Sequence, residues 1–279
     1  MNSQVTRIRR GQVTKKYRTV KNFKSFVMMV LLLTVSSHVW ASHPLITDDS
    51  GTQGKGKFQL EVNGQYDSDK ETDAGTTVRT TGGQLGGALS YGLIDTADVI
   101  LGVPYQWVRV RTDGIVDSRE RGVSDTTLEV KWRFYEKSGA SFALKPGVSL
   151  PTGNDEKGLG SGKVGYSVFF ISSWDANPWE LHINLGYRRN ENTVDVDEVK
   201  DIWHASMAAA YKVVDDLKVV ANIGVERNPN KASDRDPAFA LGGIIYAVNE
   251  NFDVDFGVKA GLNRAETDYS FLAGTAFRF

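Results

Sequence analysis

The last eleven residues of the chain, YSFLAGTAFRF from Tyr269 to Phe279, alternate between two kinds of side chain with a period of two. One face of this segment is largely aromatic, and the other carries Ser270, Leu272, Gly274, Ala276 and Arg278. A period of two is typical of a β-strand, because successive side chains point to opposite faces. Such a strand needs an apolar solvent for its aromatic face and a partner at each edge. A closed barrel in a bilayer supplies both.

The same alternation begins at Phe58, recurs along the chain, and gives about twelve strand-like segments between residues 57 and 279. The connections alternate in length: tight turns fall near residues 95–97, 136–139, 175–178, 214–216 and 249–251, and mostly longer, charged stretches fall at 69–81, 113–122, 151–163, 190–200, 227–237 and 264–268. Outer-membrane barrels have short periplasmic turns and longer external loops. The sequence therefore predicts an all-β fold, a transmembrane antiparallel up-and-down β-barrel of about twelve strands, with both termini on the periplasmic side.

Aromatic residues gather near both ends of the predicted strands, as do the two aromatic girdles of a membrane barrel. The candidates for these membrane-interface positions are Tyr91, Trp107, Trp132, Trp174, Trp179, Trp203 and Tyr211. A large soluble β-sandwich is the alternative, but it would gather its aromatics mid-strand in a core. Phe169 and Ile171 fall on the polar face of their strand, which indicates either an apolar patch inside the barrel or a shift of register.

The first 41 residues differ in kind from the rest, because they carry eight Lys and Arg residues, no acidic residue, and a short apolar stretch from Phe26 to Val35. This pattern predicts a cleaved signal peptide over residues 1–41 and export to the outer membrane of a Gram-negative bacterium; an uncleaved anchor is the alternative. Residues 42–56 are polar and rich in Gly, and we expect them to form a periplasmic lead-in to the barrel over residues 57–279.

Composition excludes several kinds of function. Cleavage after Ala41 would leave 25 Lys and Arg against 34 Asp and Glu, a net charge of about −9, which argues against nucleic-acid binding. Cysteine is absent, so disulfides, thiolate nucleophiles and cysteine metal sites are excluded. We find no catalytic motif and expect no cofactor or metal. The acidic residues Asp195, Asp197, Glu198 and Asp201 could hold divalent ions near lipopolysaccharide, but a solvated loop is the favoured interpretation.

The polar faces of the strands carry interleaved charges of both signs. The candidates to line the lumen are Glu61, Glu129, Lys131, Arg133, Lys145, His182, Arg188, His204, Lys212, Asp253, Asp255 and Lys259. Buried charges must be paired or hydrated, so a network of ion pairs across the lumen is favoured over a solute-selecting ring. Twelve strands lie between the filled barrels of about 8 strands and the open channels of 16 to 18. The residues alone leave open whether this barrel is a narrow pore or is occluded.

Three stretches resemble a known family: HPLITDDSGTQGKGKFQLE (residues 43–61), PGVSLPTG (146–153) followed by GLGSG (158–162), and the aromatic C-terminal strand. They resemble outer-membrane proteins grouped as MetA-pathway phenol-degradation transporters. The resemblance implies an outer-membrane barrel that passes small molecules of an aromatic or hydrophobic kind, and it supplies no catalytic residue. Phe277 and Phe279 resemble an assembly signal for the barrel-assembly machinery. Lipid and lipopolysaccharide of the outer membrane are then the other expected partners, and an occluded structural or interaction barrel is the alternative function.

Overall fold

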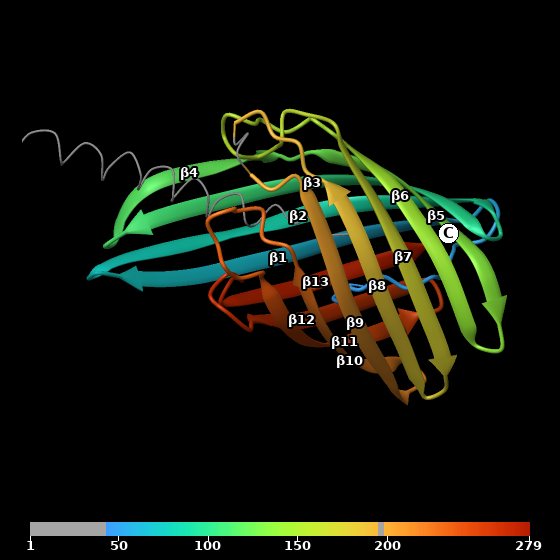
Figure 1. Ribbon diagram of the computed structural model, residues 1–279. Coiled ribbons are helices and arrows are strands. Elements are labelled where there is room, and N and C mark those ends of the chain that lie inside the picture. The colour runs from blue at the N-terminus through green and yellow to red at the C-terminus, as the bar shows by residue number, and fades with distance from the viewer. Residues whose placement is uncertain (1–42, 195–197) are drawn as a thin grey trace, which may run out of the picture.

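The computed structural model describes residues 43–194 and 198–279, and within them the chain is built from β-strands (Figure 1). The predicted signal peptide lies outside the described residues. No helix among the residues described is long and apolar enough to cross a membrane. In order, the strands are β1 (Phe58–Asp73), β2 (Thr76–Ile94), β3 (Ala97–Thr112), β4 (Ile115–Val123), β5 (Thr126–Lys137), β6 (Ala140–Leu150), β7 (Gly165–Ala176), β8 (Trp179–Arg189), β9 (Asp201–Val214), β10 (Leu217–Glu226), β11 (Ala238–Asn249), β12 (Phe252–Gly261) and β13 (Tyr269–Arg278).

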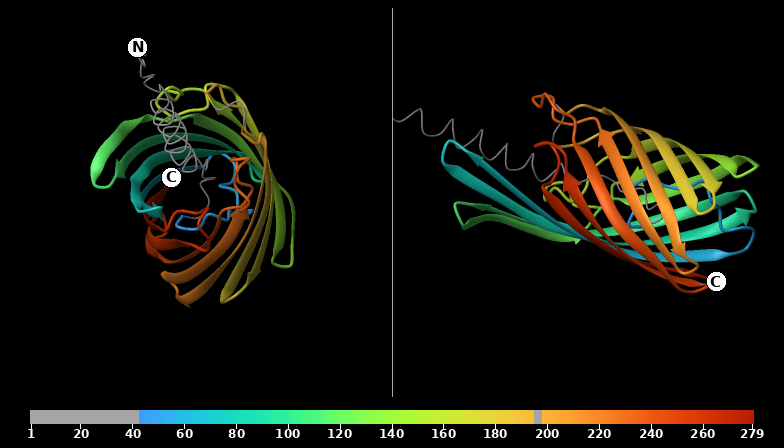
Figure 2. Two further views of the ribbon diagram at one scale, coloured as in Figure 1. Left: turned by 60° about the vertical axis from the view of Figure 1, so that its left-hand side comes forward. Right: turned by 90° about the horizontal axis from the view of Figure 1, so that it is seen from below.

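The strands close into an antiparallel barrel, as the two further views show (Figure 2). Consecutive strands pair from β5 to β13, β5 also pairs with β3, β1 pairs with β2, and β2 pairs with β3. The seam is closed by β1 and β13, whose register runs from Gln59 opposite Arg278 to Ser68 opposite Tyr269. The prediction of a twelve-stranded barrel closed by its C-terminal strand is therefore confirmed, with β4 as one additional strand.

Two of the predicted long loops are largely strands, so the predictions for residues 69–81 and 113–122 were wrong. Strands β1 and β2 pair as far as Asp73 opposite Thr76, and β3 and β4 pair as far as Thr112 opposite Ile115. Ala74 and Gly75 form the first turn with φ of 46° and 86°, and residues 113 and 114 form the second with 50° and 85°. Two residues with positive φ make the tight turn that suits the twist of a hairpin.

The extended hairpins β1–β2 and β3–β4 form a four-stranded extension beyond the barrel wall (Figures 1 and 2). Strand β3 pairs with β5 over Ala97 to Gly102 and with β4 over Tyr105 to Thr112, so β4 and β5 share one edge of β3 in succession. The partner of β3 changes next to Pro104, which has no N–H to donate to a ladder. Pro104 thus lies at the point where the extension leaves the barrel.

Outward-facing side chains are apolar and exposed, whereas the inward faces are polar and buried. Of the predicted girdle residues, Trp107 is half-buried and the other six expose between 37% and 56% of their surface on the outward face. Phe169 and Ile171, by contrast, expose 4% and 0% and pack with Ala143 inside the barrel. Strand β7 keeps its register with both neighbours, so these two residues form an apolar patch inside the lumen.

The seam generates a prediction about Phe279, which exchanges two backbone hydrogen bonds of 2.8 and 3.0 Å with Phe58 and stacks on its ring at 5.5 Å. We expect Phe279→Ala to lose about 1 kcal/mol of aromatic contact and to lower the heat-modifiable fraction of protein in the outer membrane several-fold. Gel mobility with and without boiling measures this fraction. Phe271→Ala, also on the outward face of β13, is the matched control.

Refolding in detergent separates an assembly signal from a structural contact. If Phe279 is read by the assembly machinery, the Phe279→Ala protein should refold in vitro like the wild type while failing in cells. Normal levels of heat-modifiable barrel in the outer membrane would contradict both roles.

Candidate functional site

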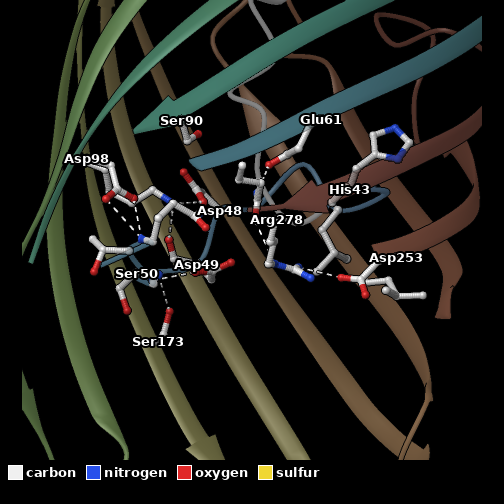
Figure 3. A pocket seen from close by; sticks show the side chains of 18 of the residues that line it. His43, Asp48, Asp49, Ser50, Glu61, Ser90, Asp98, Ser173, Asp253 and Arg278 are labelled. Atoms are coloured by element: carbon white, nitrogen blue, oxygen red, sulfur yellow. Dashed lines mark hydrogen bonds and ion pairs between the residues drawn. The ribbon is translucent and has the colours of Figure 1, made fainter. Parts of the chain in front are cut away.

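Residues 43–56, which we expected as a periplasmic lead-in, lie inside the barrel and follow its inner wall (Figures 2 and 3). We call this segment the belt. Side-chain hydrogen bonds connect it to the strands of the wall in turn. They join His43 to β12, Thr47 to β10 and β9, Asp48 to β8, Ser50 to β7 and β6, and Gln53 to β3. At Gly56 it reaches Gly92 of β2 through a hydrogen bond of 2.8 Å, and the chain then enters β1.

Inward-facing asparagines hold the backbone of the belt. Asn222 on β10 accepts the N–H groups of Ile46 and Thr47 at 2.7 and 3.0 Å, and its amide donates to the Thr47 hydroxyl at 2.7 Å. Asn184 on β8 accepts the N–H of Asp48 at 2.6 Å and donates to the Asp48 carbonyl at 2.9 Å. A side-chain amide offers both a donor and an acceptor, so it can satisfy a segment that has no strand partner.

Asp48 is the electrostatic centre of the belt. Its two carboxylate oxygens accept hydrogen bonds from Lys131 at 2.7 Å and from Lys145 at 2.5 Å, and Asp48 is 1% exposed. Lys131 also donates to the carbonyl of Asp49 at 3.0 Å, and Glu129 lies 4.0 Å from Lys145. Two buried cations on β5 and β6 are thus held by one carboxylate from the belt and by Glu129 from the wall (Figure 3 shows Asp48).

Apolar contact and wall glycines fix the start of the belt. Leu45 packs into an inward-facing cluster of β9, β10, β11 and β13 that includes Val220 and Leu241. Pro44 lies against two glycines of adjacent strands: a Cβ placed on Gly243 would lie 2.8 Å from the Pro44 ring, and one placed on Gly257 would lie 2.7 Å from it. Glycine at these inward positions therefore leaves the space that the belt occupies.

All of the predicted lumen residues occupy inward-facing positions, and they lie at three levels of the barrel. Nearest the short turns, Asp253 binds Arg278, Lys212 binds Asp215 and Arg133 binds Glu136. At mid-height lie Lys131, Lys145, Glu129, Glu61 and His182, together with Asp255, which binds His43. Nearest the long loops, Arg188 and His204 bind Glu226, and Lys259 binds Glu266. The expected interleaving of charges takes the form of short-range pairs.

His182 and His204 contact serines but are held as members of polar networks. His204 lies 3.0 Å from the hydroxyl of Ser206 and 3.3 Å from Glu226, which is the order of groups in a catalytic triad. The Ser206 hydroxyl, however, is buried and accepts a hydrogen bond of 2.8 Å from Thr47 of the belt. His182 lies 2.9 Å from Ser173, whose hydroxyl also accepts the N–H of Ser50. Both serines therefore position the belt.

A cavity of about 940 Å³ lies on the side of the belt that faces the short turns. Its lining combines belt residues with charges of both signs, and includes Asp48, Lys131, Glu61, Asp98, His182 and Asp255. Figure 3 shows Asp48, Glu61 and Asp98 of this lining from close by. A second cavity of about 100 Å³ lies toward the long loops and is lined by Glu129, Phe169 and Arg188 among others. Lys145, which is 0% exposed, lines neither cavity. The Asp48–Lys145 pair thus stands between them.

At the end of the barrel opposite the short turns, the long loops are held by their own hydrogen bonds and ion pairs. Asp125 accepts hydrogen bonds from Gly153 and Ser161, which ties loop residues 151–164 to the junction of β4 and β5. Lys200 and Arg189 both bind Glu191, and the hydrogen bond from Lys200 lowers the pKa of the Glu191 carboxyl. Asp195 and Asp197, in the acidic stretch considered for divalent ions, lie outside the described residues. Within residues 43–194 and 198–279, no cluster of three or more His, Asp and Glu side chains is placed to hold a metal.

Sequence reasoning missed the belt and its partners. The stretch has no periodicity, so it gives no strand or helix signal. Two weaker signals point to the belt. The first is a pair of inward-facing amides, Asn184 and Asn222, because a lumen filled only with water does not require amide side chains. The second is a set of inward-facing glycines on three neighbouring strands, Gly243, Gly257 and Gly274. Each of these features indicates a close neighbour inside the barrel.

The Asp48 pairs generate a prediction about the belt. Asp48→Asn leaves Lys131 and Lys145 without that carboxylate, and breaking a buried pair costs about 3–5 kcal/mol. Release of the belt would hydrate both lysines. Because the chain has no cysteine, Ser50→Cys provides a unique label at a position that is 1% exposed. We expect maleimide labelling of this cysteine to be at least about tenfold faster in the Asp48→Asn background.

Asp234→Asn is the matched control for this labelling experiment, because Asp234 is an exposed loop carboxylate. It should leave the labelling rate unchanged. A correctly folded, heat-modifiable Asp48→Asn barrel with slow labelling would show that the belt stays in place without its ion pairs.

Comparison with known proteins places this architecture in a family. Residues 47–279 match the family described as "Putative MetA-pathway of phenol degradation". An outer-membrane channel from Pseudomonas putida F1 is similar in structure, with 12% sequence identity, a TM-score of 0.64, and coverage of 83% of this chain and 98% of that chain.

The NanC porin is similar with 11% identity and a TM-score of 0.53, over 78% of this chain and 98% of its own. At such identities the likeness concerns the fold. A search of the curated proteins found no match. The family match covers the belt from Thr47 onward and all thirteen strands. The resemblance of residues 43–61 and 146–162 is therefore confirmed, and the chain belongs to the family described for the MetA pathway of phenol degradation.

Proposed function

We propose that this protein is a channel for small molecules in the outer membrane of a Gram-negative bacterium, reached by way of a cleaved signal peptide. The observation that carries the proposal is the 940 Å³ cavity, which lies inside a closed barrel and is lined by paired charges. A cavity with this lining holds water and admits small solutes. The exposed apolar band of the outward face supports a membrane location.

The belt sets the width of the proposed channel. It lies along the inner wall between the 940 Å³ cavity and the long loops, and the Asp48–Lys145 pair marks the level that separates this cavity from the 100 Å³ cavity. Rearrangement of this level would join the 940 Å³ and 100 Å³ cavities. The protein then acts by conduction and not by catalysis, since Ser206 and Ser173 are engaged by the belt.

The family description and the lumen together support aromatic or hydrophobic solutes as the class that passes. The family is described by a phenol-degradation pathway. Inside this barrel, Phe169 and Ile171 form an apolar patch, and Phe169 lines the smaller cavity on the far side of the Asp48–Lys145 pair. A flat aromatic molecule with one polar group fits a path that offers an apolar surface beside paired charges.

An occluded structural barrel is the second candidate, and one observation favours it. Lys145 and Asp48 are fully buried and paired, so the same charges that would line a pore also close it. The two candidate functions predict different effects of displacing the belt on conductance and stability. In a channel it widens an existing path, whereas in an occluded barrel it lowers stability without creating a path.

Conductance in planar bilayers tests the proposal. We expect small steps from the wild type and steps at least about twofold larger from Gly257→Val, whose side chain would occupy the place of Pro44. Gly242→Val is the matched control, because a Cβ at this neighbouring outward position meets nothing within 4 Å. Electrical silence of all three folded proteins would contradict the channel.

Uptake into vesicles tests the solute class. Vesicles that contain the wild type should take up phenol-sized neutral aromatics with one polar group several-fold faster than glycerol, a polar solute of similar mass to phenol, after subtraction of the rate through protein-free lipid. Equal rates for both solutes would indicate a general channel and refute the preference for aromatic solutes.

A further inference from the structure

The extension of β1–β4 beyond the barrel carries a row of cations on its outward face. They are Lys70, Arg79, Arg109, Arg111, Arg119 and Arg121, and we call them the basic face. The register brings them together: Lys70 lies opposite Arg79, which lies opposite Arg111. On the next level Arg109 lies opposite Arg119. Four neighbouring strands thus contribute to one continuous cationic surface.

The basic face continues the lipid-facing surface of the same strands. On β3 the outward residues are apolar from Val99 to Trp107 and become cationic at Arg109 and Arg111. The apolar part spans nine residues, and a transmembrane strand needs about 9–11. On β1 the change falls between Tyr66 and Lys70. A distance of four residues is about 13 Å along a strand, or about 9 Å along the membrane normal at a tilt of about 45°. The cations therefore lie at the depth of the lipid headgroups.

The cations of the basic face lack a carboxylate partner within the described part of the chain. Among residues 43–194 and 198–279, none of its six cations comes within ion-pairing distance of a carboxylate. At the external end of β8 and β9 the outcome differs, because Arg189 and Lys200 are bound by Glu191 and Asp201. Like charges directly opposite each other destabilise a strand pair. Three such pairs in one surface indicate that an anion from outside the chain neutralises it.

We propose that the basic face binds the phosphate groups of lipopolysaccharide in the outer leaflet. The long connections, and the extension with them, lie on the external side of an outer-membrane barrel, where this lipid forms the leaflet. Arginine suits the ligand, since its planar guanidinium binds phosphate through two parallel hydrogen bonds. Bound phosphates would also relieve the repulsion between the facing cations. The extension then fastens one side of the barrel to the leaflet, whatever solute passes through the lumen.

Binding to purified lipid A tests this inference on protein refolded from inclusion bodies, which carries no lipopolysaccharide. One variant replaces all six cations of the basic face by Gln. The matched control replaces six external cations elsewhere, Lys157, Lys163, Lys200, Arg227, Lys231 and Arg235, by Gln, and therefore has the same net charge. We expect the Kd for bisphosphorylated lipid A to rise at least about tenfold in the first variant and to change less than about threefold in the control.

A third variant, with Lys at the five Arg positions, should keep most of the affinity because it keeps the charge. Wild-type protein should bind dephosphorylated lipid A at least about tenfold more weakly than the bisphosphorylated form. Heat-modifiable mobility on gels verifies that each barrel is folded. An equal loss in the control variant, equal affinity for dephosphorylated lipid A, or equal affinity for phosphatidylglycerol micelles would overturn the proposal.

Discussion

A backbone N–H or C=O group that faces hydrocarbon has no water to bind, so every membrane-spanning strand must be paired at both edges. This constraint explains the arrangement of the wall. The ladder from β5 to β13 is continuous, and β1 closes it through ten residue pairs with β13. Strand β3 changes its partner from β5 to β4 only beside Pro104, toward the external end, and among the thirteen described strands only β4 has a single partner. Unpaired edges are thus confined to the extension, where water can satisfy them.

The same lack of water governs the charges inside. A lysine that faces the lumen needs either solvent or a counter-charge, and Lys131 and Lys145 are too deeply buried to rely on solvent. Asp48 supplies the counter-charge, with Glu129 as a more distant partner of Lys145. The belt is therefore part of the energetics of the barrel, because its Asp48 carboxylate binds both buried lysines of the wall. Its amide contacts to Asn184 and Asn222 then fix where along the wall the neutralising carboxylate sits.

Period-two alternation predicted the strand number and the inward positions of the charged residues, because a barrel wall imposes that period on every strand. It could not predict strand ends. Residues 69–81 and 113–122 look like loops because their outward positions carry Lys70, Arg79 and Arg119 in place of apolar residues, yet a strand outside the bilayer needs no apolar face. Alternation also has no means of finding the belt, whose conformation is set by contacts with eight or more strands far away in sequence. Pairing partners such as Asp48 with Lys145 depend on those contacts, so they become visible only in three dimensions.

The cations of this one sheet are therefore neutralised in two different ways. Inside the barrel, cations are paired within the chain, and their partners come from the belt, the wall and the loops. Outside it, the cations of the basic face oppose one another across β1, β2, β3 and β4 without a carboxylate from the described part of the chain. A sheet that only needed to be stable in water would alternate charge signs across neighbouring strands. Repeated placement of like charges on strands that otherwise pair regularly is costly unless the environment supplies anions at that height. An outer leaflet rich in phosphate supplies such anions. The inner and outer faces of the sheet then follow one rule, in which each buried or crowded charge has a counter-ion. The chain provides the counter-ion where water is excluded, and the membrane provides it where lipid is within reach.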